Sequence, residues 1–100
     1  MTSPGFHHDS LAARLGQRIT LSDDQGNSVS LSLDRLACSS MHGPEWESFA
    51  LIMVSDEPIA MAQGVYRIAH PELGEHDLFV SPKSYSEFEI VINRRRSSPA

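Results

Sequence analysis

Two histidines close together in the sequence, His70 and His76, are the side chains with the clearest capacity for chemistry, and Glu72 and Glu75 lie between them. Two imidazole nitrogens and one carboxylate oxygen are ligands that zinc accepts in proteins. The spacing matches no standard zinc motif, however, and a polar pair at the rim of a sheet accounts for the same residues. We therefore predict no metal site, and keep zinc bound by His70, His76 and Glu72 as the alternative.

Cys38 is the only cysteine, so no disulfide can form within the chain. Asp34, Ser39 and His42 lie nearby, but a hydrolytic triad needs a fixed geometry that a single loop rarely supplies. No strand–turn–helix elbow is present to carry a nucleophile. The sequence thus predicts no catalytic residue and no cofactor, and we interpret Cys38 as a small buried apolar side chain.

Trp46, the only tryptophan, stands between Glu45 and Glu47. It suits two roles equally well: an anchor for a partner protein, or a cover for one end of the fold. Three arginines follow at 94–96. We interpret them as a solvated tail, because the rest of the chain is acidic and no aromatic platform adjoins them.

The residues from 63 to 80 predict two strands joined by a turn, which would position the histidines. Pro71 pre-sets the φ angle of a tight turn, and Gly74 tolerates positive φ. Side chains alternate between the faces of a strand, so pairing His70 with His76 gathers apolar residues on one face and leaves a loop at 71–75. That core face holds Tyr66, Ile68, Leu78 and Val80. The opposite face holds Arg67, Ala69, Asp77 and Phe79.

The remaining segments predict one short helix and further strands. Asp9 or Ser10 caps a helix that runs to Leu15 and ends at Gly16. Apolar or alternating runs predict strands at 18–22, 29–36, 49–54 and 88–92. A change of parity near 34–35 predicts a bulge. About six antiparallel strands of this length would expose apolar area as a flat sheet. We therefore predict an all-β fold, a small, partly open barrel with the helix docked on it, and keep a two-sheet β-sandwich as the alternative.

Length and charge bound the class of protein. One hundred residues suit a single domain, which we place at 9–93, between a flexible segment at 1–8 and a flexible basic tail at 94–100. The net charge of −5 argues against partners such as nucleic acid or an anionic membrane. The N-terminus lacks the basic and apolar regions of a secretion signal. We therefore expect a cytoplasmic protein that an exported assembly could incorporate.

One stretch of the chain resembles a known family. Residues 63–74, QGVYRIAHPELG, and 78–82, LFVSP, resemble the signature of a family of small bacterial proteins known only as a domain of unknown function. The segment at 85–93 agrees with that family, whereas 47–50 departs mildly from its Glu-x-Phe-Ser pattern. Such proteins are often encoded near phage-tail or tail-collar fibre proteins, so the resemblance implies an accessory or assembly partner. It transfers no catalytic residue.

These observations favour a non-enzymatic interaction module over an enzyme. We expect a protein partner, either a tail-fibre-like protein or a second copy joined through an edge strand at 18–22 or 88–92. Phe79, Arg67 and Trp46 are the candidate contacts, because an exposed aromatic residue beside an arginine is a common contact hot spot. The alternative is a small-ligand- or metal-binding barrel, or a minimal enzyme, whose mouth would carry His70, His76, Glu72 and Trp46.

Overall fold

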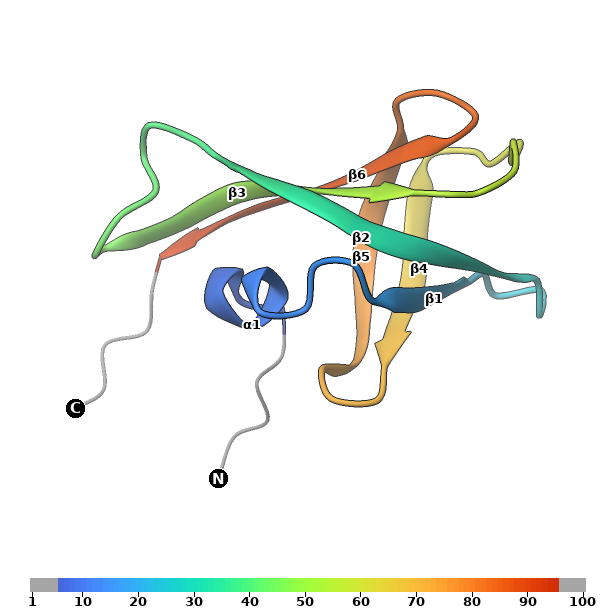
Figure 1. Ribbon diagram of the computed structural model, residues 1–100, viewed down its shortest axis with the longest axis horizontal. Coiled ribbons are helices and arrows are strands. Elements are labelled where there is room, and N and C mark those ends of the chain that lie inside the picture. Colours follow the sequence, from blue (N-terminus) through green and yellow to red (C-terminus); the bar gives the residue numbers. More distant parts are fainter. Residues whose placement is uncertain (1–5, 96–100) are drawn as a thin grey trace.

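The computed structural model describes residues 6–95. They form one short helix, α1 (His8–Ala12), and six strands (Figure 1). The strands are β1 (Arg18–Ser22), β2 (Ser28–Cys38), β3 (Trp46–Val54), β4 (Gly64–His70), β5 (Gly74–Pro82) and β6 (Glu87–Arg95). No helix in this part of the chain is both long and apolar enough to cross a membrane. Of the predicted flexible ends, 1–8 and 94–100, residues 1–5 and 96–100 lie outside the described residues.

The strands close into an antiparallel barrel in the order β1-β2-β3-β6-β5-β4. The barrel prediction is confirmed, although the ring is closed rather than partly open. β1 pairs with β2 on one side and with β4 on the other, so the predicted free edge at 18–22 is wrong. The ring closes between β5 and β6 through only two pairs, Ser81–Glu89 and Pro82–Phe88. From Ile90 onward, no strand within residues 6–95 pairs with the second edge of β6.

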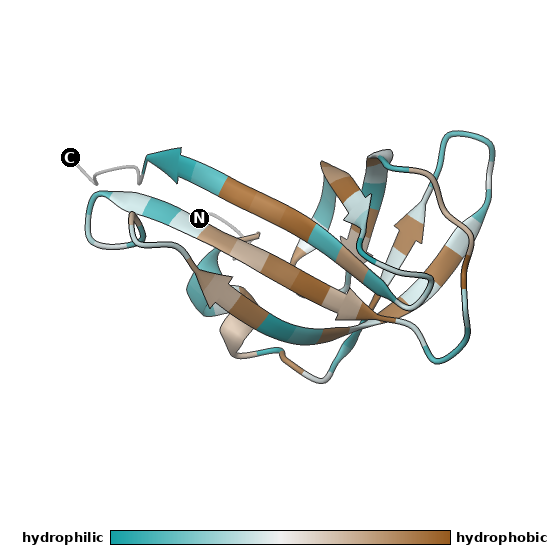
Figure 2. Ribbon diagram, turned by 90° about the horizontal axis from the view of Figure 1, so that it is seen from above, coloured by the Kyte–Doolittle hydropathy of each residue, from teal (hydrophilic) through white to brown (hydrophobic). Residues whose placement is uncertain are grey.

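Three strands continue past the ring as a longer sheet. β3 pairs with β6 along its whole length, and β2 pairs with β3 as far as Cys38 and Phe49. α1 lies against this extension (Figure 1). Figure 2 shows that β6, which leads to the C-terminus, is apolar along its middle and hydrophilic at its end. The register between β2 and β3 shifts between Leu33 and Arg35, which confirms the predicted bulge.

The interior is filled by the inward-facing residues of every strand. The largest buried side chains include Phe88, Leu31, Leu33, Leu51, Met53, Ile68 and Ile90. β3 is covered on both faces at its centre, as its unbroken apolar run predicts. Ile52 on its outer face is only 5% exposed and lies between Arg35 of β2 and Glu89 of β6.

The β4–β5 hairpin differs in register from the prediction by two residues. His70 lies opposite Gly74 rather than His76, and His76 lies opposite Ile68. Because the side-chain period of a strand is two, this shift leaves the predicted core and outer faces unchanged. The loop shortens to residues 71–73, since Leu73 is fully buried and draws the turn onto the core. Gly74 begins β5 with a φ of 82°, as the predicted turn role requires.

The N-terminal segment belongs to the domain from its first described residue. Phe6 is 3% exposed, and its ring packs edge-on against His76 of β5 with centroids 4.9 Å apart. Its carbonyl accepts a hydrogen bond from Arg94 of β6. The predicted domain limits of 9–93 are therefore too narrow within the described residues, because β6 also runs to Arg95. This segment bridges the two strands whose own pairing is shortest.

The helix is shorter than predicted, and it begins at His8, before the predicted caps Asp9 and Ser10. It ends at Ala12, so Leu11 is fully buried while Leu15 lies beyond the helix and is 42% exposed. No side chain caps its first turn. Instead, the backbone N–H of His8 donates to the carboxylate of Glu47 at 2.5 Å. A tertiary contact thus replaces the local cap that the sequence predicts at Asp9 or Ser10.

Candidate functional site

Each residue of the alternative zinc site has a separate neighbour in the structure. His70 Nδ1 accepts the Glu72 backbone N–H at 3.0 Å, so its Nε2 donates to Gln17 Oε1 at 2.8 Å. His76 Nε2 donates to the carbonyl of Leu73 at 2.7 Å. The Glu72 carboxylate faces Arg14 at 3.4 Å. The atoms that would bind a metal do not converge here, and both rings instead fix the turn.

The predicted partner contacts divide between two places. Arg67 and Phe79 share the outer face of the β4–β5 hairpin, whereas Trp46 begins β3, opposite Arg95. Phe79 is 52% exposed and lies directly across from Val65, which is 66% exposed. Trp46 is half-buried.

The outer face of the hairpin extends onto β6. Ser81 pairs with Glu89 at the end of the β5–β6 pairing. Phe79 and Val91, two residues further along each strand, therefore both face outward, although they are not paired with each other. Val91 is 64% exposed. We call Val65, Phe79 and Val91 the apolar row.

An ion pair borders the apolar row on the hairpin. Arg67 Nε donates to Asp77 Oδ1 at 3.0 Å. Hydrogen bonding and the charge of Asp77 raise the pKa of Arg67. The hydrogen bond from Arg67 lowers the pKa of Asp77 despite some desolvation. Both side chains are about half exposed, so the pair orders the surface more than it stabilises the fold.

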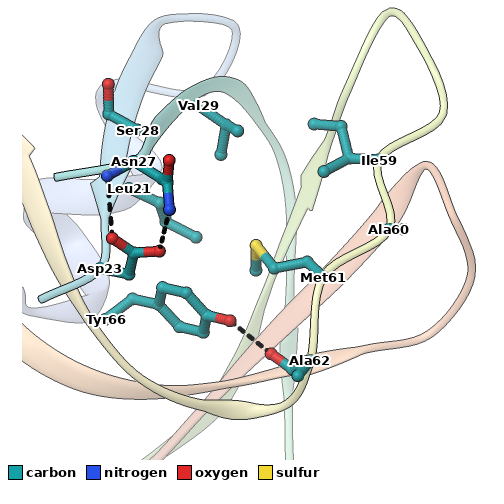
Figure 3. A pocket seen from close by; sticks show the side chains of 10 residues that line it. All are labelled: Leu21, Asp23, Asn27, Ser28, Val29, Ile59, Ala60, Met61, Ala62 and Tyr66. Carbon is teal, nitrogen blue, oxygen red and sulfur yellow. Dashed lines mark hydrogen bonds between the residues drawn. The ribbon is translucent and has the colours of Figure 1, made fainter. Parts of the chain in front are cut away.

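A pocket of about 300 Å³ opens between the β1–β2 turn and the segment that precedes β4 (Figure 3). Its polar groups already bind within the protein. Asp23 accepts hydrogen bonds from the backbone and side chain of Asn27, each at 2.9 Å. Tyr66 donates to the carbonyl of Ala62 at 2.6 Å. A ligand in this pocket would therefore meet apolar contacts from Leu21, Val29 and Met61. Few polar groups of the walls would be free to bind it.

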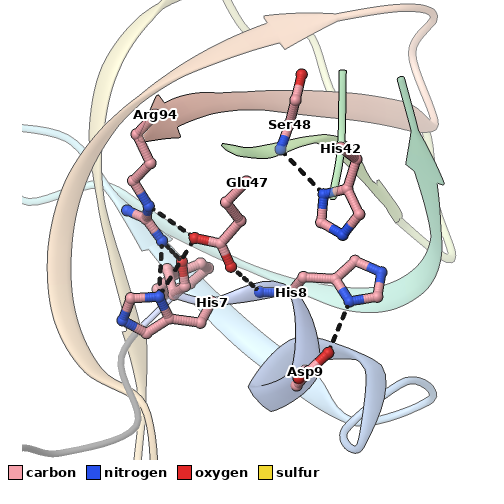
Figure 4. A network of polar contacts seen from close by, with 8 residues as sticks. His7, His8, Asp9, His42, Glu47, Ser48 and Arg94 are labelled. Atoms are coloured by element: carbon pink, nitrogen blue, oxygen red, sulfur yellow. Dashed lines mark hydrogen bonds and ion pairs between the residues drawn. The ribbon is translucent and has the colours of Figure 1, made fainter. Parts of the chain in front are cut away.

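A buried carboxylate holds the N-terminal segment against the sheet (Figure 4). The side chain of Glu47 is 3% exposed. Its Oε2 accepts the His8 backbone N–H, and its Oε1 accepts Arg94 Nε at 2.8 Å. Burial alone would raise the pKa of Glu47, but the hydrogen bonds from His8, Arg94 and His7 outweigh it and lower that pKa below its ordinary value.

A second polar cluster lies beside this network. His8, Cys38 and His42 place three possible ligand atoms within 4.8 Å of one another. Cys38 is exposed at the end of β2, so its interpretation as a buried thiol is wrong. Sequence reasoning missed the cluster because its members come from α1, from β2 and from the loop after β2. The sequence already places His42 near Cys38, but no spacing signals the approach of His8, which depends on the docking of α1.

The comparisons with known proteins give a family without an assigned activity. The profile of a family described as a domain of unknown function, DUF6916, matches residues 6–92. The comparisons with curated proteins and with solved structures give no match. The matched span covers the helix and nearly all of the barrel, so the chain belongs to the DUF6916 family of domains of unknown function.

Proposed function

We propose that the domain is a non-enzymatic interaction module that binds a protein partner through the apolar row on β4, β5 and β6. The observation that carries this proposal is the exposure of Val65, Phe79 and Val91, at 66%, 52% and 64%. Each is an apolar side chain that leaves much of its surface in water on the outside of a barrel whose core is already filled. Exposed apolar residues gathered over neighbouring strands are typical of interaction sites.

Phe79 is the expected anchor of this surface. Burying a phenylalanine side chain completely is worth about 1.5–3 kcal/mol, and aromatic anchors dominate many interfaces. Val65 lies directly across from it on β4, so one partner side chain could contact both. Arg67 adds a guanidinium on the same face, held by Asp77.

The charges around the row define the chemistry of the partner. Glu75, Asp77 and Glu89 share the outer faces of β5 and β6 with Phe79 and Val91. Arg67 pairs with Glu75 and Asp77, and Lys83 pairs with Glu89, so three carboxylates face two cations at the rim. The whole chain is acidic as well, at a net charge of −5. We therefore expect a partner surface that is apolar at its centre and basic around it.

The resemblance of the 63–82 region supports a fibre-type protein as this partner. Proteins with that signature are often encoded near phage-tail or tail-collar fibre proteins, and an accessory or assembly role follows from that neighbourhood. Binding of a small ligand at the barrel end is less well supported, because Asp23 and Tyr66 in that pocket already bind Asn27 and Ala62.

Co-purification from the native host tests the proposal. Tagged wild-type chain, Phe79→Ser and Leu15→Ser are recovered, and the proteins bound to them are identified by mass spectrometry. Leu15→Ser is the matched control. It also replaces a large exposed apolar side chain by serine, but Leu15 lies in the α1–β1 connection, away from the apolar row. We expect a fibre-type protein with wild type and with Leu15→Ser, and its loss with Phe79→Ser. Recovery of the domain alone, or equal recovery with all three chains, contradicts the proposal.

A further inference from the structure

His8, Cys38 and His42 form a group of potential metal ligands that the proposed interaction surface does not use. Cys38 Sγ and His8 Nε2 are 3.3 Å apart. The rings of His8 and His42 have centroids 4.6 Å apart. Two ligands of a tetrahedral zinc ion, bound at about 2.0–2.3 Å, stand roughly 3.5 Å from each other. The spacing of Cys38 and His8 already fits that geometry.

The surroundings of His8 prepare it to bind a metal. Its Nδ1 donates to Asp9 Oδ1 at 3.0 Å (Figure 4). This leaves the lone pair of Nε2 facing Cys38. A carboxylate that accepts the other ring N–H is the usual support of a metal-binding histidine. The backbone of His8 is fixed by Glu47, and the edge of Phe49 packs on its ring with centroids 5.4 Å apart.

His42, unlike His8, must change its tautomer before it can bind a metal through Nε2. Its Nδ1 accepts the backbone N–H of Ser48 at 3.0 Å, so its Nε2 carries the proton in the metal-free protein. To bind a metal through Nε2, His42 must move its proton to Nδ1 and give up the bond from Ser48. His42 is therefore the weakest of the three ligands.

We propose that His8, Cys38 and His42 bind a single zinc ion, with the fourth position open to water or to a ligand atom from outside the chain. One thiolate and two imidazoles form a donor set that suits zinc and other late transition metals rather than magnesium or calcium. Binding releases the thiol proton of Cys38 to solvent. Cys38 is exposed at the end of β2, so an ion can reach the site.

Metal titration of the untagged full chain tests this site. Zn²⁺ binding is measured by calorimetry, and Co²⁺ binding by the absorption that a thiolate–cobalt bond produces. We expect one ion per chain and this absorption for the wild type. Cys38→Ser abolishes the absorption, and both Cys38→Ser and His8→Gln lower zinc affinity by at least about 100-fold. Asp9→Asn lowers it about tenfold, because the support of His8 is weakened.

His7→Gln is the matched control, because His7 adjoins His8 in sequence but faces Glu47 and Arg94. It keeps wild-type zinc affinity. Thermal unfolding gives an independent readout: zinc raises the midpoint of wild type and of His7→Gln, and leaves that of Cys38→Ser unchanged. Failure of the wild type to bind zinc, equal affinity of wild type and Cys38→Ser, or equal losses in His7→Gln and His8→Gln each overturn the proposal.

Discussion

At the scale of single residues, Glu47 shows how a buried charge can fix one part of a fold to another. A carboxylate removed from water costs free energy unless partners replace its hydration. Glu47 has such partners in the His8 backbone N–H and the Arg94 guanidinium. It therefore joins the start of α1 to the end of β6. Nothing in the sequence distinguishes it from the exposed Glu45 two positions earlier.

Replacing Glu47 by glutamine tests this role. Glu47→Gln keeps the size of the side chain but removes its charge, which leaves Arg94 without an ionic partner. We expect a loss of about 1.5–3 kcal/mol in the free energy of unfolding, measured with urea. Glu75→Gln is the control, because its contact with Arg67 is exposed, and no measurable change is expected. Equal stability of Glu47→Gln and wild type contradicts this account.

Asp23, also at the scale of a single residue, makes a pH-dependent contribution to the stability of the fold. Hydrogen bonds from the side chain and backbone of Asn27 lower the pKa of Asp23 below its ordinary value. A lowered folded-state pKa stabilises the fold above the unfolded pKa, which is about 3.9 for aspartate. That stability is lost as the pH falls through the lower folded pKa.

An NMR titration of Asp23 checks the sign of this effect. Its carboxyl signal is expected to titrate below the range of an unfolded aspartate, and Asn27→Ala is expected to move the transition upward. Asp23→Ala should make the turn less stable at neutral pH. It should also remove the part of the pH dependence of unfolding that Asp23 causes. Asp24→Ala, which changes the adjacent exposed residue, is the control. A transition of Asp23 that stays in place in Asn27→Ala rules out this cause.

At the scale of elements, the sequence predicts which face of each strand is buried better than it predicts pairing. Tyr66, Ile68, Leu78 and Val80 turn inward as alternation indicates, and Phe79 turns outward. Two registers that differ by two residues bury the same side chains, so alternation cannot choose between them. In the observed register the turn is short and Leu73 is fully buried. The cluster of His8, Cys38 and His42 is harder still to predict, because His8 reaches Cys38 only after α1 docks.

The stability of the β4–β5 turn should depend on the positive φ of Gly74. Its φ is 82°, and a side chain added there would meet only His76 Nε2 at 3.8 Å. Conformational strain rather than crowding therefore sets the cost, and Gly74→Ala is expected to destabilise the protein by about 1–2 kcal/mol in urea unfolding. Gly64→Ala, at the start of β4, is the control: the added carbon meets nothing within 4 Å and φ there is not positive. Equal effects of the two substitutions argue against a strained turn.

At the scale of the whole molecule, the barrel closes with help from a segment outside its strands. β5 and β6 pair at only two positions. Phe6 packs on His76 of β5, and its carbonyl binds Arg94 of β6, so the N-terminal segment covers the seam. The same segment carries His8 to Cys38. The N-terminal segment therefore contributes both to the seam of the barrel and to the proposed metal site.

Removing the ring of Phe6 should open that seam. Phe6→Ala is expected to cost about 3–5 kcal/mol, because it leaves a cavity in the core and withdraws the contact with His76. Phe79→Ala is the matched control: Phe79 is about half exposed and lies outside the buried core, so its effect should be much smaller. Hydrogen exchange measured by NMR gives the location: amides of β5 and of β6 beyond Ile90 lose protection in Phe6→Ala, while those of the β1–β2 pair keep it. Zinc affinity is also expected to fall in Phe6→Ala, because His8 is no longer held beside Cys38. Uniform loss of protection over all six strands shows instead that the N-terminal segment stabilises the core as a whole and has no special role at the seam.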